Sequence, residues 1–198
     1  MPNILERWGI TAEELTEIVD KNPSLRGFML GYVGEYQLKK RYFSDERVSE
    51  VSKFDDHDRT NKNDLSVIYK GVRLTFEVKS LQTKTVKMVG DKFVGKFQCD
   101  ASDSREIVLP NNDKVKTTSL LVGEFDILAV NLFAFTGKWD FEFAHNKDLP
   151  RSTWKGYTEE QRKYLLATMM PISWPLPEPY TIDPFVLLDH LVAERTAR

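Results

Sequence analysis

The amino-acid sequence predicts an α+β fold in which a mixed, mainly antiparallel central sheet is flanked by helices. Three observations lead to this prediction. Apolar residues recur at helical spacing up to Phe43, alternating or continuously apolar runs follow from Leu65 to Ala144, and helix-start signals return after Pro150. Helices, then neighbouring strands joined by short turns, then helices again is an order typical of an α+β domain.

Length and composition limit the possible classes of protein. The 198 residues are 41% hydrophobic and 12% aromatic, which suffices for a packed core and predicts one domain over residues 1–198. The single cysteine, Cys99, excludes an intramolecular disulfide framework and a cysteine-based zinc site. Without an apolar run of transmembrane length or a signal-peptide pattern, we expect a cytoplasmic protein with no membrane partner.

Helical periodicity comes first along the chain. A short helix is predicted within residues 1–24, and a longer one from about residue 24 to 43. The glycines of the longer helix weaken it unless close packing against the sheet recovers the loss. Glu35 lies beside its apolar stripe and therefore needs a partner, either a metal ion or Lys39 one turn later.

A β-hairpin is predicted from Asn63 to Lys79. Two alternating runs meet at Lys70-Gly71, where the glycine supplies the positive φ that a two-residue turn needs. This turn fixes the register and places Asp64 directly opposite Glu77. One face of the hairpin is then apolar, with Leu65, Val67, Tyr69, Val72, Leu74 and Phe76. The other face carries Asp64, Ser66, Arg73, Thr75, Glu77 and Lys79.

Two carboxylates that face each other across a hairpin repel unless a cation lies between them. Opposed side chains have Cβ atoms ~5 Å apart, so Asp64 and Glu77 can hold one divalent ion together. One or two carboxylates completed by waters suit Mg²⁺, with Mn²⁺ as an alternative. Lys79 points to the same side, where its ammonium can orient a water molecule or stabilise charge developing on a phosphate.

An aspartate followed by Glu-Val-Lys on the next strand resembles the PD-(D/E)xK nuclease superfamily. The residues that carry the resemblance are Asp64, Glu77 and Lys79, and the pattern departs at Asn63, where the family has proline. The resemblance implies a restriction-endonuclease-like core over about residues 24–135. It also implies that Glu35, on the preceding helix, joins the metal site.

The distribution of charge agrees with a phosphate-containing partner, although the net charge is −2. Basic residues outnumber acidic ones from Arg59 to Lys96, and such a segment beside a carboxylate pair suits phosphodiester binding. The residues we expect to contact DNA are Lys84, Lys87, Gln98, Ser102 and Arg105. A solvated lysine face, and a turn at 100–104 that merely caps itself, are the alternatives.

Residues 44–63 predict a polar, irregular connection. It contains Asp55, Asp56, His57 and Asp58, for which a solvated loop is the preferred interpretation over a second metal site. Further strands are predicted at 95–99, 105–110 and 139–144, the last of them at an edge of the sheet, with a turn at Asn111-Asn112-Asp113. A central strand buried on both faces is predicted at 123–135, where Asp126 is expected to be solvated at the strand end rather than catalytic.

The C-terminal segment, about residues 150–198, is predicted to be a helical and proline-rich extension. Thr158 and Gln161 have capping-box spacing at the start of a helix predicted to reach Met169. Asp183-Pro184 begins a last amphipathic helix, on which His190 is expected at the surface. The proline run between these helices predicts a strap packed on the core.

Together with the resemblance to the PD-(D/E)xK superfamily, these patterns predict a Mg²⁺-dependent DNA endonuclease that hydrolyses phosphodiester bonds, similar to a restriction enzyme. Because one site cuts one strand, we expect a homodimer or two successive binding events for double-strand cleavage. The alternative is a DNA-binding or assembly protein that has a nuclease-like fold without cleaving. A small-molecule enzyme is disfavoured, since the sequence has no phosphate-cradling glycine loop and no nucleophile elbow.

Overall fold

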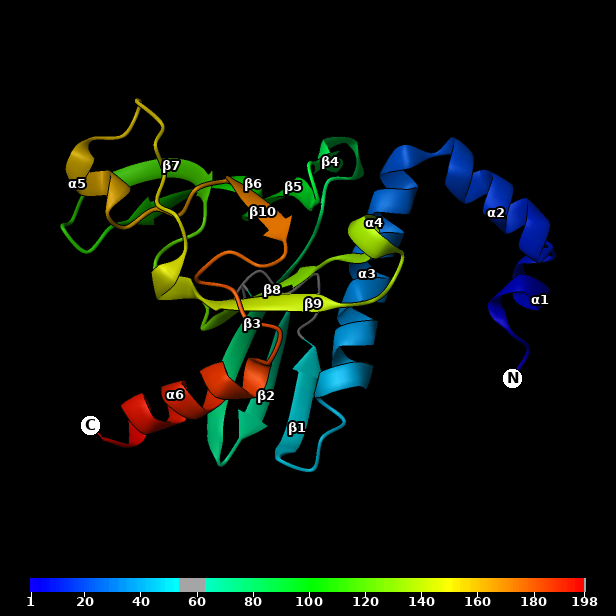
Figure 1. Ribbon diagram of the computed structural model, residues 1–198, viewed down its shortest axis with the longest axis horizontal. Coiled ribbons are helices and arrows are strands. Elements are labelled where there is room, and N and C mark those ends of the chain that lie inside the picture. Colours follow the sequence, from blue (N-terminus) through cyan, green and yellow to red (C-terminus); the bar gives the residue numbers. More distant parts are fainter. Residues whose placement is uncertain (54–62, 198) are drawn as a thin grey trace. The chain divides into compact units, whose positions relative to one another are not determined.

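The computed structural model describes residues 1–53 and 63–197 (Figure 1). Within them the chain divides into two compact units, Met1–Val33 and Gly34–Arg198. The smaller unit holds α1 (Ile4–Trp8), α2 (Ala12–Lys21) and the first half of α3 (Pro23–Tyr42). The larger unit holds the rest of α3, all the described strands and the other helices. That the whole chain is one domain stays a prediction.

Capping boxes begin both short helices of the smaller unit. In α2 the Thr11 side chain accepts a hydrogen bond from the Glu14 amide, and the Glu14 carboxylate accepts one from the Thr11 amide. Asn3 and Glu6 form the same arrangement at α1, which Gly9 ends at a φ of 64°. The N-terminal segment therefore forms two helices before α3, where the sequence predicts one.

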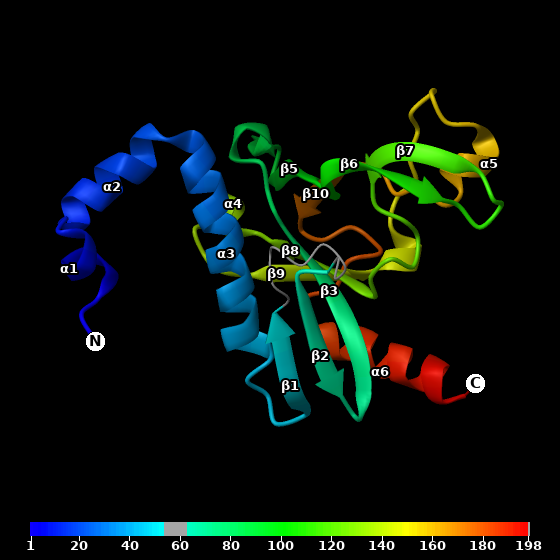
Figure 2. The ribbon, with the colours of Figure 1, turned by 180° about the vertical axis from the view of Figure 1, so that it is seen from behind.

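A five-stranded sheet forms the centre of the larger unit (Figures 1 and 2). Its order is β1-β2-β3-β8-β9, with β3 and β8 parallel and the other pairs antiparallel. The strands are β1 (Val48–Lys53), β2 (Leu65–Tyr69), β3 (Val72–Ser80), β8 (Ile127–Asn131) and β9 (Phe141–His145). The predicted α+β class with a mixed, mainly antiparallel sheet is confirmed.

The other described strands form two smaller sheets. One has the order β10-β5-β4, and the other is a two-stranded ribbon of β6 and β7. Their bounds are β4 (Lys87–Val89), β5 (Lys92–Gln98), β6 (Asp100–Val108), β7 (Lys114–Ser119) and β10 (Met169–Trp174). The remaining helices are α4 (Phe133–Thr136), α5 (Glu159–Arg162) and α6 (Pro184–Thr196), with 3₁₀ turns η1 (Thr83–Thr85) and η2 (Asn146–Asp148).

Four sequence predictions of secondary structure are wrong in detail. Strand β1 lies where a polar connection was expected, because Val48 and Val51 pair with β2 and supply its inward face. Residues 100–104 belong to β6 rather than a turn, with a register shift against β7. The helix that starts at Thr158 ends at Arg162, and Met169, its predicted end, is instead the first residue of β10, which pairs with β5. The predicted central strand at 123–135 is shorter than expected: only Ile127–Asn131 form a strand, β8, and Phe133–Thr136 form α4.

The sequence analysis also considered an acidic cluster with a histidine in the connection before β2. Its residues, Asp55, Asp56, His57 and Asp58, lie outside the described residues.

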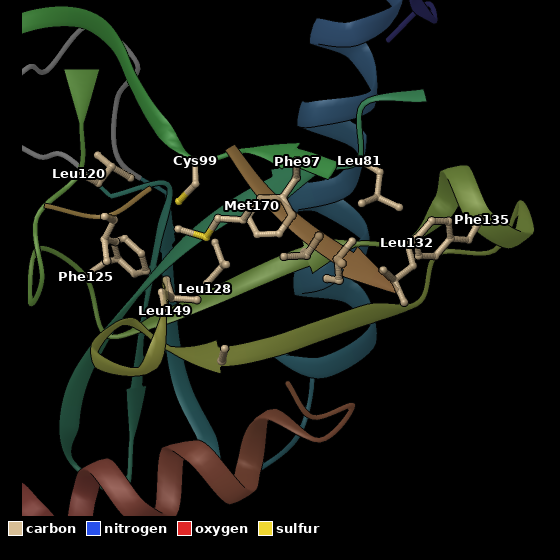
Figure 3. Packing of buried hydrophobic residues seen from close by; sticks show 14 residues of the cluster. Leu81, Phe97, Cys99, Leu120, Phe125, Leu128, Leu132, Phe135, Leu149 and Met170 are labelled. Carbon is tan, nitrogen blue, oxygen red and sulfur yellow. The ribbon is translucent and has the colours of Figure 1, made fainter. Parts of the chain in front are cut away.

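Strand β8 is buried on both faces, as the sequence predicts, and separates two hydrophobic clusters. Leu128 and Val130 point into the first cluster, which β5 and β10 cover with Phe97 and Met170 (Figure 3). The alternate residues Ile127 and Ala129 belong to the second cluster. Leu38 of α3, Leu188 and Leu191 of α6 pack in this second cluster, so two helices cover that face. Full burial of such a side chain contributes about 1.5–3 kcal/mol.

The second half of α3 packs closely on the sheet at one point. A Cβ on Gly34 would lie 3.2 Å from Nδ2 of Asn131, which in turn donates to Ser80 Oγ. Gly34 therefore has the close neighbour on the sheet that the sequence predicts for the glycines of this helix. Among the described residues, none of the helices is both long enough and apolar enough to cross a bilayer.

Candidate active site

The hairpin of β2 and β3 has the register that the sequence predicts. Leu65 pairs with Phe76 and Tyr69 with Val72, so the turn falls at Lys70-Gly71. Both turn residues have positive φ, 48° at Lys70 and 78° at Gly71, which is the backbone of a two-residue hairpin turn. An ion pair holds Lys70 in this conformation, since its Nζ lies 2.6 Å from Oδ1 of Asp189 on α6.

The two faces of the hairpin have opposite roles. The apolar residues that the sequence assigns to one face pack in the second cluster beneath α3 and α6. The other face brings Glu77 and Lys79 to the side of the sheet that β5 and β6 cover. The Glu77 side chain is only 4% exposed. Successive side chains of a strand point to opposite faces of the sheet, so the position of Glu77 on β3 directs its carboxyl group into the interior.

Glu77 is held by one oxygen only. Lys79 Nζ lies 2.6 Å from Glu77 Oε1, whereas Glu77 Oε2 is buried without a hydrogen-bond partner among the described residues. Asp64 is nearby, and its Oδ2 accepts a hydrogen bond of 2.7 Å from the Val78 amide. Burial raises the pKa of Glu77 to about 7; Lys79 acts in the lowering direction and the negative charge of Asp64 in the raising one.

Lys79 is a protonated ammonium at neutral pH. Burial acts to lower the pKa of Lys79, but the negative charges of Glu77 and Asp64 outweigh burial and raise it above its usual value. Its Nζ also donates to the backbone carbonyl of Asp100, at 3.4 Å, where β6 begins. The neighbouring thiol of Cys99 is buried and its pKa is raised to about 12, so it is neutral and unreactive.

A second ion pair lies next to this site. Arg105 on β6 makes a two-pronged pair with Glu124, whose Oε2 also accepts from the Leu121 amide. The charge of Glu124 contributes to the raised pKa of Glu77. Sequence analysis missed Glu124 and Asp100, since nothing in the local pattern shows that loops this distant along the chain return to β3.

Glu35 has a partner that the sequence did not suggest. Its Oε2 lies 2.6 Å from Nζ of Lys53 on β1, rather than pairing with Lys39 on its own helix. Among residues 1–53 and 63–197, no three or more histidine, cysteine, aspartate or glutamate side chains form a group arranged to bind a metal. A metal site of Asp64, Glu77 and Glu35 therefore stays a prediction.

A cation would nevertheless fit two of these residues. Glu77 Oε2 is a buried acceptor that lacks a partner within the described chain, and the Asp64 carboxylate lies close enough to affect it. Both donors are hard carboxylate oxygens, which suit Mg²⁺. The fit is thus to one or two carboxylates with water completing the coordination.

The residues predicted to contact DNA are not equivalent. Lys84, Lys87 and Ser102 are exposed. Gln98 is also exposed and bonds Gln82 and Asp100 through its amide. Arg105 is partly buried and engaged by Glu124, so its charge is already neutralised within the protein.

Two other acids of the larger unit have different surroundings. Asp126 joins strands, because its Oδ2 accepts from the Thr75 amide and its Oδ1 pairs with Arg195. Its side chain is 15% exposed, so this residue is an anchor rather than the solvated strand end that was expected. Glu142 on β9 is fully buried, and burial raises its pKa to about 8.

Comparisons with known proteins place the chain near one solved structure. No protein-family profile matches the chain, and no curated protein sequence matches it. The structure is similar to that of a bacterial homing endonuclease, I-Ssp6803I, with 16% sequence identity and a TM-score of 0.43, over 85% of this chain and 94% of that one.

Proposed function

We propose that this protein is a metal-dependent DNA endonuclease of the PD-(D/E)xK type, with Mg²⁺ or Mn²⁺ as its cofactor. The observation that carries the proposal is the buried Glu77, which has one oxygen paired with Lys79 and the other without a partner in the described chain. A buried carboxylate next to a second carboxylate is unfavourable unless a cation or a proton joins them. The site therefore has a reason to bind a cation.

The roles of the residues follow from their positions. Asp64 and Glu77 would hold the metal ion, which supplies charge neutralisation at the phosphate and an activated water molecule. Lys79 would donate hydrogen bonds to the attacking water or to a phosphate oxygen. Because its pKa is raised, Lys79 acts through its positive charge and not as a general base. Glu35 would support the site from α3.

The pKa of Glu77 couples metal binding to pH. Because burial raises the pKa of Glu77 to about 7, a cation that binds near neutral pH would displace a proton from this carboxyl group. Metal binding therefore releases protons, and the affinity rises with pH through this range.

Cleavage of supercoiled plasmid and of short linear DNA tests the proposal. The assay compares Mg²⁺, Mn²⁺ and EDTA, and the variants Glu77→Ala and Lys79→Ala with Lys138→Ala as a control at an exposed lysine. Metal-dependent nicking or linearisation that both site variants lose, and the control keeps, is the expected result. Absence of cutting in every metal overturns the proposal.

The second candidate is a DNA-binding or assembly protein that does not cleave. It is favoured by the direct Lys79–Glu77 ion pair, which neutralises much of the carboxylate charge without a metal. It predicts DNA binding that is unchanged by EDTA and by both site variants. Sedimentation of the DNA complex measures whether two copies assemble, and so distinguishes a homodimer from two successive binding events in double-strand cutting.

A further inference from the structure

The ribbon of β6 and β7 has one buried face and one exposed face. Ile107 and Val115 pair across it and pack, with Leu109, on Tyr157 and Leu165 in a third cluster. On the opposite face Glu106 pairs with Lys116 and Val108 with Lys114. The residues Ser104, Glu106, Val108, Lys114 and Lys116, which we call the outer face, are all exposed.

The ribbon is attached to the candidate active site at two points. The carbonyl of Asp100, the first residue of β6, accepts a hydrogen bond from Lys79 Nζ. Further along β6, Arg105 pairs with Glu124, whose charge contributes to the raised pKa of Glu77. These two contacts fix the position of the first half of β6 relative to the carboxylate pair.

The chemistry of the outer face is that of a surface that reads hydrogen-bonding groups. It offers a hydroxyl, two ammonium groups and a carboxylate, with a single large apolar side chain, Val108, at 59% exposure. A protein partner would be expected to require a larger apolar centre. Two lysines against one glutamate give this face the sign of charge that attracts a polyanion.

We propose that the outer face of the β6–β7 ribbon enters the major groove of duplex DNA and reads base edges several base pairs from the cleavage position. This inference rests on the proposed function and adds the specificity element to the same site. The major groove is about 12 Å wide and admits a two-stranded ribbon. Lysine suits guanine, glutamate accepts from cytosine, and the methyl groups of Val108 suit the thymine methyl.

The attachment at Asp100 also predicts how far the bases read by the ribbon lie from the scissile phosphate. Residues Ser104 to Val108 lie four to eight positions further along β6. A strand advances ~3.4 Å per residue, which is about one base pair of duplex DNA. Where the ribbon follows the groove, the bases that it reads lie about four to eight base pairs from the scissile phosphate.

The test selects bound sequences from a randomised duplex pool, with Ca²⁺ in place of Mg²⁺. Full-length wild type is compared with Ser104→Ala, Lys116→Ala and Lys114→Ala, and with Lys138→Ala as the exposed-lysine control. Thermal melting of each variant checks that the fold is kept, which the exposure of all four positions favours. Wild type and control should enrich one sequence pattern, and each ribbon variant should lose about 5- to 100-fold of the discrimination at one base position.

The salt dependence of affinity separates base reading from contact with the backbone. A lost base contact leaves the slope of log affinity against log salt unchanged, whereas a lost phosphate contact reduces it by about one. Ribbon variants that keep the wild-type sequence pattern, or a wild type without any pattern, overturn the inference. The inference is also overturned if the ribbon variants change only the slope of log affinity against log salt and keep the sequence preference.

Failure of this inference is distinguishable from failure of the proposed function. If no metal supports cutting, but the ribbon variants lose sequence preference, the nuclease proposal fails, and base reading by the ribbon stands without a cleavage position. If wild type cuts at defined sites and all ribbon variants cut at the same sites, the nuclease proposal stands and the ribbon inference fails.

Discussion

Glu77 and Glu142 lie on the same face of the five-stranded sheet, on β3 and β9, with β8 between them. Lys79 pairs laterally with Val130, and Val130 with Glu142, so one row crosses the three strands. Burial raises the pKa of both glutamates, to about 7 for Glu77 and about 8 for Glu142. The two carboxyl groups have similar burial and different neighbours.

Their neighbours give the two glutamates different chemistry. Glu77 has Lys79 on one oxygen and the charge of Asp64 nearby, and under the proposed function it would exchange a proton for a cation. Neither Glu142 oxygen has a hydrogen-bond partner among the residues described, and burial is the cause of its shift. Leu128, Val130 and Ala144 surround this face as part of the first cluster. A raised pKa alone therefore does not identify a catalytic acid, and the charged neighbours of Glu77 are what make it the candidate.

The largest expected effect separates the two residues by activity. Glu77→Gln should lower the rate of DNA cleavage by about 10²-fold or more, because a metal ligand and its charge are lost. Glu142→Gln should leave cleavage within about twofold of wild type. Single-turnover plasmid cleavage measures both, and equal losses in the two variants would mean that both glutamates act in catalysis.

The next effect separates them by stability. A carboxyl whose folded pKa exceeds its unfolded value binds more protons when folded, so stability falls as pH rises from about 4.5 toward the folded pKa. For Glu142 this loss occurs up to about pH 8 and is of the order of a few kcal/mol. Glu142→Gln should remove it and raise the free energy of unfolding at pH 8, but change little at pH 4.5. Urea unfolding at both pH values checks the sign; a variant less stable at pH 8 contradicts it.

A smaller effect tests the exchange of proton for cation at Glu77. Below the Glu77 pKa of about 7, each decrease of one pH unit should weaken the apparent affinity for Mg²⁺ about tenfold, since one proton must leave Glu77 before the cation binds. Mg²⁺ should therefore raise the melting temperature more at pH 8 than at pH 6. In Glu77→Gln the dependence should disappear, whereas in Glu142→Gln it should be the same as in wild type.

The smallest effect concerns the influence of Asp64 on its neighbour. Asp64→Asn removes a negative charge but keeps an oxygen that can accept from the Val78 amide. The pKa of Glu77 should then fall, and that of Glu142 should not move. Titration of the carboxyl carbons by NMR gives both values in one sample, and an unmoved Glu77 would show that Asp64 lies too far away to share a cation.

The surroundings of Glu77 could largely be predicted from the sequence, whereas those of Glu142 could not. The alternation on both sides of Lys70-Gly71 predicts the hairpin register, which the observed pairing of Leu65 with Phe76 confirms. Glu142 belongs to an alternating run that predicts an edge strand. The edge position of β9 is confirmed, but its polar residue is covered by other parts of the chain.

The sequence by itself determined the local features of this protein. Turn residues, strand alternation and capping boxes act over a few positions, so they define the hairpin, the start of α2 and the two faces of β3. The tertiary structure alone decided which groups meet. It paired Glu35 with Lys53, and it brought Asp100 and Glu124 beside the carboxylates. The reason is physical: burial and long-range charge pairing depend on chain packing, which no local period encodes.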